Sequence, residues 1–235
     1  SIAVIPFDNK GADEDVFYAY GISADLIGDL TQLGIIKVSS INDIDKIENY
    51  NQKKAIELAE SLEVRYIVQG SLWRMNDVFQ LNVDLYDSKE LKVKWSDRWQ
   101  EKWEDLPNIK NKLCSELSKI LNRISNEYFG ETMTNSEAYK IYLKGKYLCN
   151  NPKNKSDIDD GIKLYKEALE KDNSLLDAIL AITWARMRYD YEESMEYNEK
   201  LKCYLDENPE IEKFDSYLTR YYSFNGWIKE HKTRK

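Results

Sequence analysis

Residues 64–99 contain three consecutive strand-like segments, and the alternation of apolar and polar residues in the second and third constrains the fold more than any other feature. In the middle segment the alternate residues from Leu81 to Leu85 are apolar, which places them on one face of a β-strand. Asn76-Asp77 stands where a two-residue hairpin turn belongs. The sequence therefore predicts a three-stranded antiparallel meander whose one apolar face needs helices to cover it.

The third segment repeats the alternation with Val93, Trp95 and Trp99, which the pattern places on the same buried face. Trp95 lies in the middle of this segment. We therefore expect Trp95→Ala to destabilise the domain by an amount on the order of a few kcal/mol, as other truncations of core aromatics do.

The segments around the meander predict the rest of a mixed α/β domain. Strands are predicted at 2–6 and 35–38, and helices over 15–33, near Ile41, over 53–62 and over 106–127. The resulting order is β-α-β-α-β-β-β-α. Its helical crossovers favour parallel pairing between the early strands and the strand that begins near Val64. This domain is expected to occupy residues 1–131.

Beyond a polar joint at 130–134 the periodicity is only helical, which predicts an all-α domain over residues 132–235. Five amphipathic helices are expected, with the fifth running from Ile211 to about Phe224 and its partner beginning near Trp227. Pairs of such helices at a period near 34 residues are typical of tetratricopeptide-type repeats. Small residues, among them Gly145 and Gly161, are expected where two helices cross closely.

Charge and reactive residue types narrow the functions that this chain can have. A net charge of −8 argues against a nucleic-acid partner, because phosphate backbones require clustered Lys and Arg. No apolar run approaches the ~20 residues of a membrane span. The widely spaced Cys114, Cys149 and Cys203 are interpreted as buried free thiols, and the one histidine, His231, lies in a charged tail. We expect neither a metal nor a cofactor.

Paired carboxylates are the remaining route to catalysis. Asp159 with Asp160, or Asp84 with Asp97, could serve a hydrolase, but adjacent carboxylates at a helix start more often cap the helix. The acidic residues 13–15 could hold a cation, although such clusters usually stabilise the helix dipole. Residues 21–28 lack the Lys-Ser/Thr of a phosphate-binding loop. The sequence favours a protein without catalysis of its own.

Four stretches of the first half resemble the TolB amino-terminal-like domain, which is related to the FlgO and CsgG lipoprotein group. They are Ser-Ile-Ala-Val-Ile-Pro-Phe-Asp-Asn at 1–9, Tyr-Gly-Ile-Ser-Ala-Asp-Leu-Ile-Gly-Asp-Leu at 20–30, Leu-Glu-Val-Arg-Tyr-Ile-Val-Gln-Gly-Ser-Leu-Trp-Arg at 62–74 and Trp-Ser-Asp-Arg-Trp at 95–99. Residues 136–149 and the segment from Gly161 resemble the tetratricopeptide repeat helices that follow this domain in such proteins.

The resemblance implies a place in a larger bacterial signalling protein. Such domain pairs occur in class III adenylate and guanylate cyclases, CadC-like winged-helix regulators and serine/threonine kinases, behind an effector domain in the same chain. It implies a non-catalytic sensory or protein-interaction region, with a nucleotide cyclase as the favoured parent. The chain begins inside a strand pattern, so we expect an internal fragment. An outer-membrane-associated or periplasmic lipoprotein scaffold stays open as the alternative, and the cytoplasm is favoured over the periplasm.

Aromatic residues on the predicted repeats supply candidates for partner binding, because aromatic side chains anchor interfaces. We expect a protein or peptide partner on the concave surface of the repeats, at Tyr139, Tyr142, Lys146 and Trp184. The alternative is that these side chains pack between the repeats.

The predicted half repeat at the carboxyl end would leave an apolar flank bare. We therefore expect the chain either to self-associate through Phe214, Leu218, Tyr222 and Trp227, for example as a homodimer, or to fray at this end.

Overall fold

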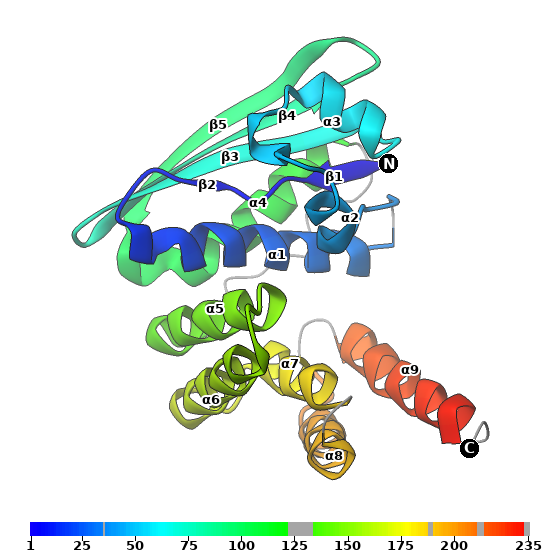
Figure 1. The fold of residues 1–235 in the computed structure, drawn as a ribbon. Helices are drawn as coiled ribbons and strands as arrows, with labels where there is room; N and C mark the ends of the chain where they lie inside the picture. The colour runs from blue at the N-terminus through cyan, green and yellow to red at the C-terminus, as the bar shows by residue number, and fades with distance from the viewer. Residues whose placement is uncertain (35, 122–133, 188–189, 211–213, 233–235) are drawn as a thin grey trace. The chain divides into compact units, whose positions relative to one another are not determined.

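The chain forms two compact units in a computed structural model: unit 1, Ser1–Ser136, and unit 2, Glu137–Lys235 (Figure 1). The structure describes residues 1–34, 36–121, 134–187, 190–210 and 214–232, and of 214–216 and 227–232 the backbone alone. Unit 1 is a mixed α/β domain and unit 2 is helical, which confirms the predicted fold class. The expected boundary between residues 131 and 132 lies outside the described residues.

One five-stranded mixed sheet organises unit 1. Its strands are β1 (Ile2–Val4), β2 (Asp8–Asn9), β3 (Tyr66–Met75), β4 (Val78–Asp87) and β5 (Lys92–Lys102). Strand β3 pairs in parallel with β1 and β2 and antiparallel with β4, and β4 pairs antiparallel with β5. The predicted meander is therefore confirmed. Its first turn is Asn76-Asp77, in which Asn76 has a φ of 54°.

Two parts of the predicted sheet differ from the structure. The described residues of 35–38 form no strand, and only Val38 makes a single parallel bridge to Ile2. The segment after Phe7, for which no strand is predicted, contains the short strand β2. Both pairings involve one or two residues, which is too few for a period-two alternation to reveal.

Helices α1 (Val16–Gln32) and α4 (Leu106–Ile120) cover one face of the sheet (Figure 1). Gly34 follows α1 with a φ of 62°, the left-handed conformation that glycine adopts without strain. Pro107 stands in the first turn of α4, where its missing N–H removes no helical hydrogen bond. Both helix ends are as predicted, and the expected extension of α4 to residue 127 lies outside the described residues.

The core beneath these helices is built on β4, whose Phe79, Leu81 and Leu85 are fully buried. Trp103 belongs to the 3₁₀ helix that leads into α4, and it packs edge-to-face on Tyr18 at 4.7 Å and on Phe79 at 5.8 Å between ring centroids. The aromatic cluster thereby ties α1 and α4 to the same face of the sheet.

The opposite face is covered along β1 and β3 by α2 (Ile41–Asp45) and α3 (Ala55–Ser61). Ile44 and Leu58 from these helices pack against Ile67 of β3. Farther along the same face Asp84 and Arg98 are exposed. We call this part, around Trp73, Asp84 and Arg98, the uncovered face.

Strand β5 contains a β-bulge at Lys94 that the alternation does not predict. Lys94 has no partner in β4, whereas Val93 and Trp95 pair with successive residues of that strand. The extra residue turns Val93 to the face opposite Trp95, and Val93 is 52% exposed. The prediction that Val93 and Trp95 share a buried face is wrong, and Trp95 and Trp99 are only half-buried.

The described residues of unit 2 form helices α5 (Ser136–Asn150), α6 (Lys155–Lys171), α7 (Leu176–Arg186), α8 (Tyr191–Glu207) and α9 (Phe214–Lys232). Helices α5 and α6 cross closely: a Cβ atom on Gly145 would lie 2.7 Å from the carbonyl oxygen of Gly161. A Cβ atom on Gly161 would lie 2.5 Å from Cys149 Sγ. No side chain fits at either position, which confirms the expected close crossing.

Helix α9 is continuous from Phe214 to Lys232. The prediction of one helix ending near Phe224 and a second beginning near Trp227 is therefore wrong. Asn225-Gly226 is a common turn dipeptide, but a single glycine inside a helix costs only about 1 kcal/mol relative to alanine. That cost is too small to break the helix here.

Candidate functional site

A groove with a volume of about 630 Å³ lies between β5 and α4 in unit 1. Its strand wall consists of Asp97, Trp99 and Glu101, which share one face because side chains alternate along a strand. The register pairs them with buried residues of β4, so they lie on the side of the sheet that α4 covers. The groove therefore lies where α4 stops covering the apolar face of the sheet.

The helix wall of the groove is a polar stripe on α4. Its residues recur at intervals that keep them on one side of the helix. They are Asn108, Asn111, Lys112, Ser115, Glu116 and Lys119, and Asp105 precedes them in the 3₁₀ helix. The apolar stripe of α4, with Ile109, Leu113 and Leu117, is buried. One helix thus covers the core with one stripe and lines the groove with another.

Carboxylates outnumber ammonium groups in the groove, where four carboxylates and two lysines form part of the lining. Lys112 Nζ lies 2.6 Å from Glu101 Oε1 and joins the two walls, while Lys119 pairs with a carboxylate of its own helix at 2.7 Å. Within the described parts of the chain, the other two carboxylates, of Asp97 and Asp105, have no ion-pair partner. The excess of negative charge favours a cationic ligand.

Strand β5 forms an edge of the sheet, and β4 is its only strand partner among the described residues. An edge strand presents a row of backbone N–H and C=O groups toward solvent. The Trp99 ring stands beside this edge, tilted against the Trp95 ring at 5.7 Å between centroids. The groove therefore combines a strand edge, a half-buried indole and two carboxylates without an ion-pair partner among the described residues. Of these two, Asp97 accepts from the backbone N–H of Arg98 at 2.7 Å.

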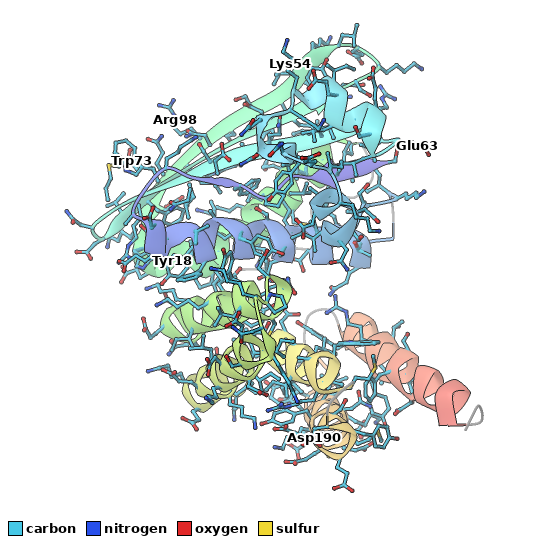
Figure 2. All side chains as sticks on the ribbon, viewed as in Figure 1. Tyr18, Lys54, Glu63, Trp73, Arg98 and Asp190 are labelled. Carbon is cyan, nitrogen blue, oxygen red and sulfur yellow. The ribbon has the colours of Figure 1, made fainter. Side chains whose placement is uncertain are left out.

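The charges on residues 95–102 of β5 are sorted by face. Asp97 and Glu101 lie on the groove side, whereas Arg98 and Lys102 lie on the opposite side. Figure 2 shows Arg98 with Trp73 on the side of the sheet that faces away from α1. Arg98 Nε donates to the amide oxygen of Asn82 at 3.0 Å, which orients the guanidinium on the uncovered face.

The carboxylate pairs considered for a hydrolase are not brought together as catalytic pairs. Asp84 lies on the uncovered face and Asp97 on the groove side, so the sheet separates them. Asp159 lies 2.7 Å from Arg186 Nη1, and Asp160 lies 2.8 Å from Lys163 Nζ. These contacts match ordinary surface ion pairs.

The acidic residues 13–15 form a 3₁₀ helix in front of α1. Asp15 is buried and pairs with Arg74 Nη1 at 3.2 Å, and the Arg74 guanidinium lies 4.4 Å from the Trp103 ring centroid. Asp15 thus binds a side chain of the sheet instead of capping its own helix. In the described residues no group of three or more His, Cys, Asp or Glu side chains is placed to hold a metal ion.

The four residues expected to bind a partner differ in exposure. Tyr139 and Tyr142 are buried and stacked at 6.0 Å, and the half-buried Lys146 donates to the Tyr142 hydroxyl at 3.1 Å. Trp184 is 41% exposed and packs edge-to-face on Phe224 at 5.5 Å. The burial of the tyrosines favours the alternative in which they pack inside the helical unit, whereas Trp184 keeps a surface that a partner could contact.

The residues expected to mediate self-association lie on α9. Leu218 is half-buried and Tyr222 is 58% exposed. The side chains of Phe214 and Trp227 lie outside the described residues. Self-association stays a prediction.

The cysteines are free thiols with three different environments. Cys114 is buried, Cys149 is half-buried and Cys203 is exposed, so the prediction of a buried thiol is wrong for Cys203. Burial raises the pKa of the Cys149 thiol to about 11, which keeps it protonated and unreactive at neutral pH. No described helix has both the length and the apolar composition to cross a bilayer.

Sequence reasoning found Asp97 but missed the groove as a site. The signal was present: alternate residues of the third strand include two carboxylates, and a polar stripe on the following helix runs beside its apolar stripe. What joins them is the antiparallel return of α4 along β5, which no local pattern specifies.

A curated protein from Rhizobium meliloti (strain 1021), named "Putative adenylate cyclase 3", is 30% identical to this chain over 118 residues. The match covers 48% of this chain and 19% of that protein, so the chain spans about a fifth of the length of the curated relative that it matches.

Two solved structures are similar at low sequence identity. TolB from Acinetobacter baumannii is 20% identical with a TM-score of 0.43, over 55% of this chain and 30% of that one. A PelC dodecamer from Paraburkholderia phytofirmans is 19% identical with a TM-score of 0.36, over 53% of this chain and 89% of that one. The protein named "Putative adenylate cyclase 3" is thus among the proteins to which this chain is similar, in line with the cyclases that the sequence resemblance names.

The model of one protein family matches residues 1–120. This match includes the whole sheet and both walls of the groove. The family is described as HilA/YgeH-like transcriptional regulator, second domain, and the chain belongs to it.

Proposed function

We propose that this chain is a non-catalytic regulatory and protein-interaction region of a larger bacterial signalling protein. The observation that carries the proposal is the match of residues 1–120 to the second domain of a transcriptional regulator. The adenylate cyclase relative supports it, because the matched region is 19% of that protein and most of its length consists of other segments. The effector is accordingly a separate segment, either a regulator of transcription or a nucleotide cyclase.

The arrangement of the carboxylates supports a role without chemistry of its own. Asp84 and Asp97 are separated by the sheet, and Asp159 and Asp160 are held in ion pairs. A general acid and base need mutual reach, and the sheet prevents this for Asp84 and Asp97.

Unit 2 serves in this proposal as a tetratricopeptide-type array that presents a surface to a protein or peptide. The close crossing of α5 and α6 at Gly145 and Gly161 supports tightly stacked helix pairs. Trp184, with 41% of its surface exposed, is the predicted aromatic that can act as an anchor.

A cytoplasmic location is part of the proposal. Three free cysteines, of which Cys203 is exposed, suit a reducing compartment better than an oxidising one. Cell fractionation checks this, and recovery of the protein in the periplasmic fraction would favour the lipoprotein-type scaffold instead.

Two measurements test the proposed function. The purified chain is assayed with ATP, GTP and model phosphate, ester and glycoside substrates, and we expect no turnover above the blank. An activity that Asp97→Asn abolishes would make the chain an enzyme and end the proposal. In the full gene product, an in-frame deletion of residues 1–120 should change the response of the effector to its signal, whereas an unaltered response would exclude a regulatory role for unit 1.

A further inference from the structure

We propose that the β5 edge and the adjoining groove bind an extended segment of a partner protein. The segment adds to the sheet next to β5 and places Arg or Lys side chains in the groove. The inference rests on the proposed protein-interaction role of the chain and names the chemistry of the partner. It concerns main-chain pairing at the edge and side-chain charge in the groove, which can be tested separately.

Main-chain pairing comes from the exposed edge. Strand β5 runs over 11 residues, Lys92–Lys102, and has β4 as its only strand partner in the described part of the chain. A peptide strand added about 4.8 Å beyond it would pair with the outward N–H and C=O groups. Such bonds provide affinity for any extended backbone, so the side chains must provide the selectivity.

Selectivity comes from the groove wall of β5. Alternate side chains of an added strand would point to the groove side, next to Asp97, Trp99 and Glu101. A cation opposite Asp97 forms a favourable cross-strand pair with a carboxylate that has no ion-pair partner among the described residues. A guanidinium over the half-buried Trp99 ring gains a cation–π contact. Both interactions select Arg or Lys at every second position.

Charges on edge strands commonly serve to prevent pairing, and β5 is rich in them. Within residues 95–102, however, the signs are sorted by face, with Asp97 and Glu101 toward the groove and Arg98 and Lys102 on the uncovered side. In a two-fold dimer that joins β5 to β5 antiparallel, like faces adjoin, so carboxylates meet carboxylates and cations meet cations. This distribution of charges disfavours pairing of β5 with a second copy of this chain. It favours pairing with a strand that carries the opposite charge on each face.

The partner segment is therefore basic on its groove side and acidic or neutral on its other side. A synthetic peptide of about nine residues, long enough to span residues 95–102, represents it with Arg at every second position and Glu or Thr between. A first control peptide has the same composition with its Arg residues in one block. A second control keeps the sequence but carries N-methyl groups on alternate backbone amides, which removes the hydrogen bonds and retains the charge.

Binding of these peptides to the full 235-residue chain is followed by fluorescence anisotropy at low and moderate salt. We expect the alternating peptide to bind at least roughly tenfold more tightly than either control, because only this peptide satisfies both the edge and the groove. Its affinity should fall as salt increases. Amide exchange should show new protection in β5. Equal binding of the N-methylated peptide would exclude strand addition, and equal binding of the block peptide would exclude the alternating pattern.

Substitutions on either side of the sheet locate the site. Asp97→Lys reverses the charge in the groove, and we expect it to weaken binding by roughly tenfold. Asp84→Lys makes the same change on the exposed, uncovered face of β4 and should leave the affinity unaltered. If both substitutions weaken peptide binding equally, then binding depends only on the net charge of the chain, and the proposal is overturned. The comparison of the three peptides uses the unsubstituted chain, so it tests the proposal even if a substituted chain folds poorly.

Failure of this inference and failure of the proposed function give different results. If no peptide binds up to millimolar concentration, strand addition at β5 is excluded, whereas the effector response to deletion of residues 1–120 still decides the regulatory role. If the chain proves catalytic, the regulatory proposal fails, whereas selective binding of the alternating peptide would still establish the edge and groove as a binding site.

Discussion

Strands β4 and β5 are neighbours with similar alternating sequences, yet they bury very different amounts of apolar surface. In β4, Phe79, Leu81 and Leu85 are fully buried, whereas in β5 Val93 is 52% exposed and the tryptophans are half-buried. Strand β4 lies between two strands beneath helices, while β5 is an edge at which the cover ends. Alternation therefore shows which side chains share a face only where no bulge interrupts the pairing, and the neighbouring elements decide how deeply that face is buried.

The largest loss of stability is expected when a core residue of β4 is truncated. Leu81→Ala removes a fully buried side chain from beneath α4, and we expect a loss of about 3 kcal/mol in the free energy of unfolding of unit 1. Amide hydrogen exchange of the β3 and β4 amides measures this for unit 1 alone. Leu91→Ala is the matched control, because Leu91 is 67% exposed, and it should change stability by less than about 0.5 kcal/mol. A loss under about 1 kcal/mol for Leu81→Ala would mean that β4 is not in the core.

The second prediction concerns the charged end of β4, where Asp87 is fully buried beside Arg65. Arg65 Nε and Nη2 donate to its carboxylate at 3.1 Å and 2.8 Å, and this hydrogen bonding holds the pKa of Asp87 below its ordinary value. The unfolded-state pKa is about 3.9. Because the folded-state pKa is lower, the pair stabilises unit 1 above the unfolded value, and this contribution is lost as pH falls through the folded-state pKa.

Asp87→Asn should therefore lower the free energy of unfolding by about 1–2 kcal/mol at neutral pH. The estimate is modest because Arg65 keeps 40% of its side chain exposed, so solvent screens the pair. The asparagine retains an oxygen that can accept from the backbone N–H groups of Lys89 and Glu90. Exchange measured between neutral pH and about pH 3 should show a smaller dependence on pH in the variant than in the parent. Asp84→Asn, on the exposed face of the same strand, should change the free energy of unfolding by less than about 0.5 kcal/mol at neutral pH.

Most of the fold of unit 1 follows from patterns that the sequence displays. The meander, the Asn76-Asp77 turn and the end of α1 at Gly34 are local signals, and the structure confirms each. The errors lie where local signals are absent: β2 and the bridge at Val38 are too short to alternate, and the bulge at Lys94 is decided by pairing with β4. The sequence likewise contains a turn dipeptide inside α9 that the helix overrides.

Less of the candidate site could be predicted. Asp97 was considered, but as the partner of Asp84, which turns out to lie across the sheet. The groove exists because α4 returns along β5 and brings its polar stripe opposite Asp97 and Trp99. Such a juxtaposition depends on tertiary packing, and no spacing along the chain encodes it. For Tyr139 and Tyr142 the sequence leaves two interpretations open, because an aromatic side chain suits an interface and a packed core equally well, and the burial of both rings favours packing.

The third prediction concerns the stability loss when an aromatic residue of the edge strand β5 is truncated. Trp95→Ala removes a half-buried edge side chain whose ring lies 5.7 Å from the Trp99 ring between centroids. We now expect a loss of about 1 kcal/mol or less in the free energy of unfolding, well below that of Leu81→Ala, because edge aromatics lose little buried area. Exchange of the β3 and β4 amides measures both variants on one scale. A loss of about 3 kcal/mol for Trp95→Ala would restore the original prediction that this residue belongs to the core.

The smallest expected effect lies in the turn that joins the two strands. Leu91 has a φ of 54°, a left-handed conformation that strains a leucine, and no glycine stands in this turn. Leu91→Gly relieves the strain but gives the unfolded chain more freedom, and the exposed side chain loses little contact when it is removed. These opposing effects predict a net gain of about 0.5 kcal/mol. Leu91→Asn should act in the same direction, since asparagine tolerates this conformation, whereas Leu91→Val should destabilise because branching at Cβ increases the strain. If Leu91→Gly lowers the stability measured by exchange of the β4 amides, then Leu91 packs on the hairpin, and β5 is held to β4 by more than its backbone ladder.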